Sequence, residues 1–147
     1  MSRAEGAGAP AALEVGAELV AAMLEHARRE LPLEACGLVG GRDARALLFL
    51  PAANRLASPT AYSIDPEELL WLFQRLEREG LELVGLFHSH PRGRAYPSAT
   101  DLRLAYYPQA VYLIASLAGA GPELRGYRIA GGRVERVALV SPGTRRG

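Results

Sequence analysis

The stretch LELVGLFHSHPRGRAYPSATDLRLAYY, residues 81–107, contains the signals that decide the fold prediction. Its first ten residues alternate between apolar and polar side chains and then become mostly apolar, which is typical of a buried strand. Pro91 ends this strand because proline cannot donate a backbone hydrogen bond to a neighbouring strand. Ser98 and Asp101 then suit the N-cap and N3 positions of a short helix, which we expect over residues 99–107.

Further helices and strands are predicted on both sides of this stretch. Apolar side chains recur at helical spacing over residues 13–31, until Pro32 stops the helix. A second helix is expected from a good N-cap, Asp65, to Gly80, with Glu68 completing a capping box. Short apolar runs bounded by glycine-rich turns predict strands over residues 34–41, 44–54, 110–117, 123–131 and 132–140.

This order of elements predicts a single domain of mixed α/β (α+β) class, with a central, mainly antiparallel sheet flanked by helices. The length of 147 residues suits one domain, and 49% apolar residues suffice for a full core. We expect the domain to cover residues 13–140. Residues 1–12 are rich in glycine and alanine without periodicity and predict a flexible N-terminal tail, while residues 141–147 predict a C-terminal tail.

Composition narrows the classes of function. The formal net charge of +1 argues against a protein built mainly to bind nucleic acid, whose affinity comes from many phosphate contacts. No apolar run is long enough to span a bilayer, and Glu14 and Glu18 interrupt any signal-peptide core. The single cysteine, Cys36, cannot form an internal disulfide, which fits a reducing compartment. We therefore expect a soluble cytoplasmic protein with no membrane partner.

His88 and His90 are candidate metal ligands. Because residues i and i+2 of a strand point to the same side, the two imidazoles would project together from the strand end. Asp101 would return to them in the first turn of the next helix, and two histidines with one carboxylate are typical of a catalytic zinc site that keeps one position open. Considered alone, a helix cap explains Ser98 and Asp101 better than catalysis does, but it leaves the paired histidines unexplained, so spacing alone leaves both interpretations open.

The segment HSHPRGRAYPSATD, residues 88–101, is similar to the His-x-His-Pro-x6-Ser-x-x-Asp signature of the JAMM (MPN+) zinc metalloprotease family. LPLEACGLVGG at residues 31–41 resembles the segment that carries the catalytic glutamate in the short prokaryotic form of that family. AANRLASPTAYSIDPEEL at residues 52–69, which includes Asn54, resembles the region between these two elements. The resemblance runs over residues 13–140 and implies a cytidine-deaminase-like fold.

The resemblance also implies a role for each matching residue. His88, His90 and Asp101 match the ligands of Zn²⁺. Glu34 matches the general base that acts on the attacking water, and Ser98 matches the residue whose hydroxyl stabilises the oxyanion. Without the resemblance, the residue type would not single out Glu34, since other glutamates lie near the same helix end.

The function implied is hydrolysis of amide or isopeptide bonds after the C-terminal Gly-Gly of ubiquitin-like proteins. In bacteria the matching substrates would be ubiquitin-like sulfur carriers, released from protein adducts or from an added amino acid such as cysteine. The alternatives are a non-catalytic MPN-type interaction scaffold and a DNA-repair-associated JAMM-like protein. The sequence leaves open a homodimer, the identity of the carrier and the leaving group. It also leaves open whether Cys36, Arg92 and Arg94 contribute to the site.

Overall fold

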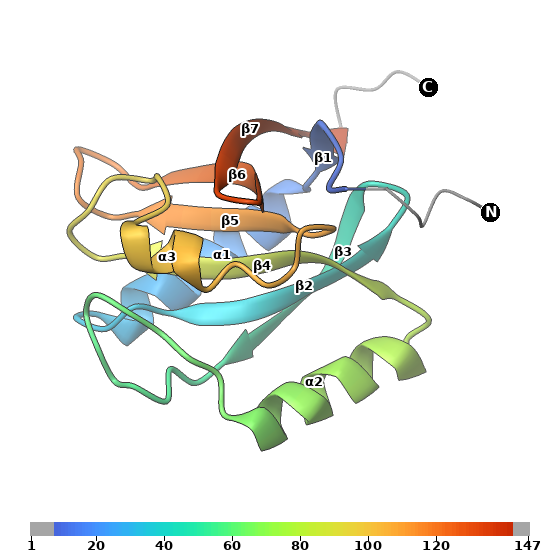
Figure 1. The fold of residues 1–147 in the computed structure, drawn as a ribbon, viewed down its shortest axis with the longest axis horizontal. Coiled ribbons are helices and arrows are strands. Elements are labelled where there is room, and N and C mark those ends of the chain that lie inside the picture. The colour runs from blue at the N-terminus through green and yellow to red at the C-terminus, as the bar shows by residue number, and fades with distance from the viewer. Residues whose placement is uncertain (1–7, 143–147) are drawn as a thin grey trace.

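The computed structural model describes residues 8–142, and the elements below lie within them (Figure 1). None of the helices in this part of the chain is long and apolar enough to cross a membrane. The helices are α1 (Ala17–Glu30), α2 (Pro66–Arg78) and α3 (Ala99–Arg103). The strands are β1 (Ala12–Glu14), β2 (Cys36–Arg42), β3 (Arg45–Ala52), β4 (Glu82–His90), β5 (Val111–Ser116), β6 (Glu123–Ala130) and β7 (Arg133–Val140).

The strands form one mixed sheet that closes on itself in the order β1-β3-β2-β4-β5-β6-β7. The pairs β2–β3, β2–β4, β5–β6 and β6–β7 are antiparallel, whereas β4–β5 and both pairs made by β1 are parallel. The mixed α/β class and the mainly antiparallel pairing expected from the sequence agree with this arrangement. The closure of the sheet was not expected from the sequence.

Strand β1 closes the sheet, and it corrects the prediction of a helix over residues 13–31. Leu13 is fully buried and pairs with Leu139 of β7, while Glu14 pairs with Arg45 of β3. The helix begins only after Gly16, whose backbone is extended. A strand of three residues is too short to show a period of two, so its apolar residues were read as the first turn of the helix.

The segment preceding β1 also contacts the domain. Ala9 is buried, its N–H donates to the Pro108 carbonyl at 3.2 Å, and its carbonyl accepts from Arg128 at 3.1 Å. Of the two predicted tails, residues 1–7 and 143–147 lie outside the described residues.

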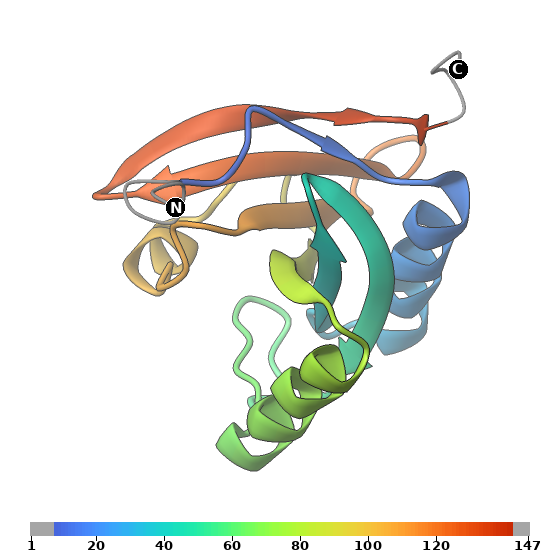
Figure 2. The same cartoon turned by 90° about the vertical axis from the view of Figure 1, so that its right-hand side faces the viewer.

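Two apolar clusters fill the two faces of the sheet, and β5 contributes to both because its side chains alternate. Val111, Leu113 and Ala115 pack with Met23 and Ala27 of α1 in one cluster. Tyr112 and Ile114 pack with Leu72 and Leu76 of α2 in the other. Figure 2 shows the two helices at different places around the curved sheet.

The helix signals at residues 65–80 are largely confirmed. Asp65 caps α2 by accepting from the Glu67 N–H at 3.0 Å, and Pro66 is the first helical residue. Glu68 accepts from the Ala53 N–H at 3.3 Å and so ties α2 to the end of β3. Helix α3 is shorter than the predicted 99–107, because the chain turns after Leu104 and the Tyr107 N–H donates to the Tyr112 hydroxyl.

Candidate metal centre

The C-terminal end of β4 carries the two candidate histidine ligands side by side. His88 and His90 are both buried, with 1% and 8% of their surface exposed. Their Nε2 atoms lie 3.2 Å apart. The strand continues through His90 itself, so the alternation of side chains brings both rings to one side of the sheet.

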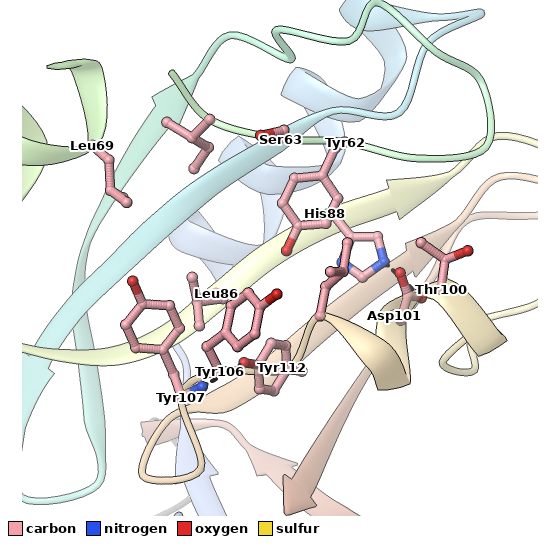
Figure 3. A pocket seen from close by; sticks show the side chains of 12 residues that line it. Tyr62, Ser63, Leu69, Leu86, His88, Thr100, Asp101, Tyr106, Tyr107 and Tyr112 are labelled. Atoms are coloured by element: carbon pink, nitrogen blue, oxygen red, sulfur yellow. Dashed lines mark hydrogen bonds and ion pairs between the residues drawn. The ribbon is translucent and has the colours of Figure 1, made fainter. Parts of the chain in front are cut away.

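Helix α3 brings the third candidate ligand to the same point. Oδ2 of Asp101 lies 3.1 Å from Nε2 of His88 and 3.1 Å from Nε2 of His90. All three candidate ligand atoms lie within 4.8 Å of one another, and Figure 3 shows Asp101 facing His88. Two imidazole nitrogens and a carboxylate oxygen that converge in this way form a donor set that fits Zn²⁺.

Contacts behind the rings fix their orientation. Nδ1 of His90 hydrogen-bonds the Arg94 carbonyl at 2.8 Å, which makes Nδ1 the protonated nitrogen and leaves Nε2 as the ligand atom. The Tyr62 ring stacks on the His88 ring at 4.7 Å between centroids, with 26° between the planes (Figure 3). The rings are therefore held by the fold with Nε2 directed toward Asp101.

The charges of these groups suit a cation. Burial raises the pKa of Asp101, but hydrogen bonds with His88 and His90 outweigh burial and hold that pKa well below its usual range. Burial lowers the pKa of His88. The shifts favour an anionic Asp101 and a neutral His88, which are the protonation states that bind a metal. Burial also lowers the pKa of His90, but hydrogen bonds with Asp101 and the Arg94 carbonyl outweigh burial and raise it, so a cation would have to compete with a proton there.

Glu34 lies two residues before the start of β2, the strand that pairs with β4. Cys36 pairs with His88, and the pairing extends to Ala35, whose carbonyl accepts from the Ser89 N–H at 3.0 Å. This register places Glu34 opposite His90. Its side chain is 3% exposed, and Oε1 has no hydrogen-bond partner among the described residues.

The environment of Glu34 changes its acidity. Burial raises its pKa to about 8, while His90 lowers that pKa and Asp101 raises it. A carboxyl with a pKa near neutrality can both take up and release a proton at physiological pH. These are the properties of a general base that later acts as a general acid.

Ser89 joins the two strands on the side away from the histidine rings. Its Oγ accepts from the Ala35 N–H at 2.8 Å, and the residue is fully buried.

We expect Ser89→Ala to lower the free energy of unfolding by about 1–3 kcal/mol, because the buried Ala35 N–H loses its partner. Urea denaturation measures this effect, with Ser58→Ala as the control, since that hydroxyl lies in an exposed contact with Thr60. Equal midpoints for Ser89→Ala and Ser58→Ala would contradict the expected role.

Ser98 is the N-cap of α3, as predicted. Its Oγ accepts from the Asp101 N–H at 3.0 Å, and its own N–H donates to Oδ2 of Asp101 at 2.9 Å, which completes a capping box. The cap uses the serine oxygen as an acceptor and leaves its O–H proton for another partner. The helix-cap and metal-site interpretations are therefore compatible, since the cap aims the Asp101 carboxylate at the histidines.

Cys36 is buried at the start of β2, where it pairs with His88 of β4. Burial, together with the carboxylates of Glu68, Glu30 and Glu34, raises the pKa of its thiol to about 12. Its Sγ lies 3.6 Å from the Ala53 carbonyl. A thiol in this environment stays protonated and packs as a small apolar side chain.

We expect Cys36 to resist alkylation in the folded protein. At pH 8 iodoacetamide should react at least about 10²-fold more slowly than in the urea-unfolded chain, because it requires an accessible thiolate. Mass spectrometry of timed samples measures both rates, and the unfolded chain is the matched control. Equal rates would contradict the burial of this thiol.

An apolar cavity of about 190 Å³ adjoins the ligand cluster, with His88 and Asp101 at its edge (Figure 3). The loop after β3, the end of α3 and strands β4 and β5 supply its other walls. These walls include Tyr62, Tyr106, Tyr107, Tyr112, Leu86 and Leu104.

A family model described as prokaryotic homologs of the JAB domain matches residues 16–130, most of the chain. The chain belongs to this prokaryotic JAB family. The resemblance to the JAMM/MPN+ family seen in the sequence is thereby confirmed.

Curated proteins and solved structures agree with membership of the JAB family. The CysO-cysteine peptidase of Mycobacterium tuberculosis is 41% identical over 83% of this chain and 86% of that protein. The desampylase of Haloferax volcanii is 40% identical over 71% of this chain and 80% of that protein. A solution structure of a Desulfitobacterium hafniense protein is 38% identical, with a TM-score of 0.81 over 88% of this chain and 92% of that chain.

A more distant structure is described as a JAMM metalloprotease-like zinc site of the proteasome and signalosome. It is 18% identical, with a TM-score of 0.56 over 88% of this chain and 98% of that chain, and so shares the fold.

The structure brings together the five residues predicted from the sequence, and it adds supporting groups that the sequence pattern did not indicate. Tyr62, Ser89 and the Arg94 carbonyl were not predicted, although each supports a site residue. The serine between the two histidines was a usable signal, because its side chain must point to the opposite face of the strand. Arg92 and Arg94 are exposed, and Arg94 lies 4.9 Å from the centre of the Tyr96 ring.

Proposed function

We propose that this protein is a zinc-dependent peptidase that cleaves amide or isopeptide bonds after the C-terminal Gly-Gly of ubiquitin-like sulfur carriers. The observation that carries the proposal is the convergence of His88, His90 and Asp101 next to a buried glutamate whose Oε1 has no hydrogen-bond partner within residues 8–142. The names of the relatives support the substrate class, since one is a CysO-cysteine peptidase and another a desampylase.

His88, His90 and Asp101 would hold the ion through Nε2, Nε2 and Oδ2. When bound there, Zn²⁺ supplies Lewis-acid polarisation of the scissile carbonyl and lowers the pKa of water. The protein fixes the donor atoms before binding, because the Arg94 carbonyl orients one ring and Tyr62 supports the other. This organisation limits the rearrangement that binding requires.

Glu34 would take a proton from the attacking water at its carboxylate and deliver that proton to the leaving amine. Its raised pKa supports both steps near neutral pH, since neither protonation state is strongly disfavoured. Ser98 would donate its O–H to the oxygen that develops negative charge, while its Oγ accepts from Asp101 N–H in the cap. Neither step requires a covalent intermediate with Cys36.

The apolar cavity beside His88 supports a further expectation about the substrate. Glycine residues at the cleavage point carry no side chain, so the cavity would take an apolar side chain of the substrate outside the Gly-Gly pair. The scissile bond would then lie against the ligand cluster at the edge of the cavity.

The proposal is tested with a sulfur carrier that ends in Gly-Gly, joined either to a C-terminal cysteine or through an isopeptide bond to lysine. We expect the zinc-loaded protein to cleave at least one of these substrates. Activity should disappear after chelation and return with added Zn²⁺. Full activity in a protein shown to lack metal would contradict the metal assignment, and the ratio of the two rates identifies the preferred leaving group.

The two alternative functions predicted from the sequence lack such an observation. A non-catalytic scaffold would have no need of converging ligand side chains, and no observation favours a DNA-repair role. The cytoplasmic location, the homodimer and the cytidine-deaminase-like label of the fold stay predictions.

A further inference from the structure

The buried side chain of Asn54 hydrogen-bonds an unusual number of backbone groups. The two hydrogens of its Nδ2 are shared among three carbonyls, those of Glu34 at 3.0 Å, Ala61 at 3.0 Å and Ser58 at the longer distance of 3.3 Å. Its Oδ1 accepts from the N–H groups of Leu56 at 3.1 Å and Ser63 at 3.3 Å. Every partner of Nδ2 is a carbonyl and both partners of Oδ1 are N–H groups, so the orientation of the amide is chemically determined.

One of these contacts reaches the backbone of Glu34. The Glu34 carbonyl accepts from Asn54, and the Glu34 N–H donates to the Ser58 carbonyl at 2.9 Å. Both backbone groups of Glu34 are therefore fixed by the loop over residues 54–63. Because Oε1 of Glu34 has no hydrogen-bond partner in the described part of the chain, these backbone contacts help to determine where its carboxyl lies.

The same side chain fixes the segment that supports the metal ligands. Asn54 bonds the Ala61 carbonyl and the Ser63 N–H, the residues on either side of Tyr62. Tyr62 in turn stacks on His88 and forms part of the cavity wall (Figure 3). One buried carboxamide thus connects the candidate general base to the residue that packs against a candidate metal ligand.

We propose that Asn54 is a positioning residue that holds Glu34 and Tyr62 in a fixed relation across the active site. The inference rests on the proposed function. Asn54 binds no reacting atom in this arrangement, and it acts through the backbone of Glu34 and through the loop. A displacement of a catalytic group by about 1 Å can cost about 10²-fold in rate, which sets the size of the expected effect.

The test compares Asn54→Asp and Asn54→Ala with Arg55→Ala, an exposed neighbour in the same loop. Asn54→Asp keeps the shape and the acceptor but removes both donor hydrogens, and with them the contacts to three carbonyls. We expect kcat per zinc-loaded molecule to fall about 10²-fold in both Asn54 variants, with KM changed less than about fivefold, because the loss falls on the chemical step. Arg55→Ala should match the wild type.

Two readouts are independent of activity. The affinity for Zn²⁺ should stay within about threefold of the wild type, since the three candidate ligands are retained. In Asn54→Ala, hydrogen exchange should accelerate at the amides of Leu56 and Ser63, which lose their acceptor. If one Asn54 variant does not fold, the other carries the comparison.

The outcomes separate the two claims. Absence of cleavage by the zinc-loaded wild type overturns the proposed function, whatever the variants do. An active wild type with a kcat for the folded, zinc-loaded Asn54 variants within about threefold of it overturns the positioning role. A fall in activity that is fully explained by lost zinc or lost folded protein also overturns it.

Discussion

Replacing Glu34 with glutamine is expected to lower kcat about 10³-fold while leaving zinc binding intact. General acid–base groups typically contribute about 10²–10⁴-fold, and glutamine keeps the shape of glutamate but can no longer take up the proton. Glu34 is not among the converging ligand atoms, so the metal content should be unchanged. Steady-state kinetics together with the zinc stoichiometry of the same preparation measure both quantities.

The matched control for this variant is Glu25→Gln. Glu25 is an exposed glutamate of α1 that forms an ion pair with Arg29, whereas Glu34 is buried. It should retain the kcat of the wild type. A Glu34→Gln protein with full activity would contradict the assignment of the general base. Loss of zinc in that protein would show that Glu34 contributes to metal binding instead.

Replacing His88 with alanine is expected to abolish both zinc binding and cleavage. Mutation of a residue that only supports a metal ligand typically lowers metal affinity about 10–100-fold. Loss of a ligand itself should therefore weaken zinc binding by at least about 10²-fold. Titration with a competing chelator measures the affinity. His88 is 1% exposed, and its removal leaves a cavity, so Asp101→Asn provides a second variant that keeps the volume of the side chain.

The control for His88→Ala is His26→Ala, which changes the remaining histidine of the chain. His26 hydrogen-bonds the Cys36 carbonyl at 3.0 Å and lies outside the converging cluster. It should keep the zinc affinity of the wild type. Wild-type affinity in both His88→Ala and Asp101→Asn would show that the cation binds elsewhere.

The candidate ligand set was predictable because each of the sequence signals that indicate it is local. The alternation of a strand places His88 beside His90, and the cap of a helix places Asp101 in its first turn. The proline and serine between them mark the loop that joins the two elements. These patterns predict the structure correctly because each depends only on residues that are close together in the sequence.

Other features depend on contacts between distant segments, and the sequence pattern does not contain them. Glu34 reaches His90 only through the pairing of β2 with β4, so only the family resemblance selected it among nearby glutamates. The contacts of Asn54 and the stacking of Tyr62 depend on how the loop after β3 folds back. The closure of the sheet depends on three residues of β1, too few to carry a periodic signal.

The most direct test of the central claim is the intact mass of the products formed from a sulfur carrier conjugate by the zinc-loaded protein. We expect a carrier that ends in Gly-Gly, together with the released amine, and no such product with Glu34→Gln at equal zinc occupancy. A conjugate that stays uncut at full zinc occupancy, or that is cut at another bond, would contradict the proposed function.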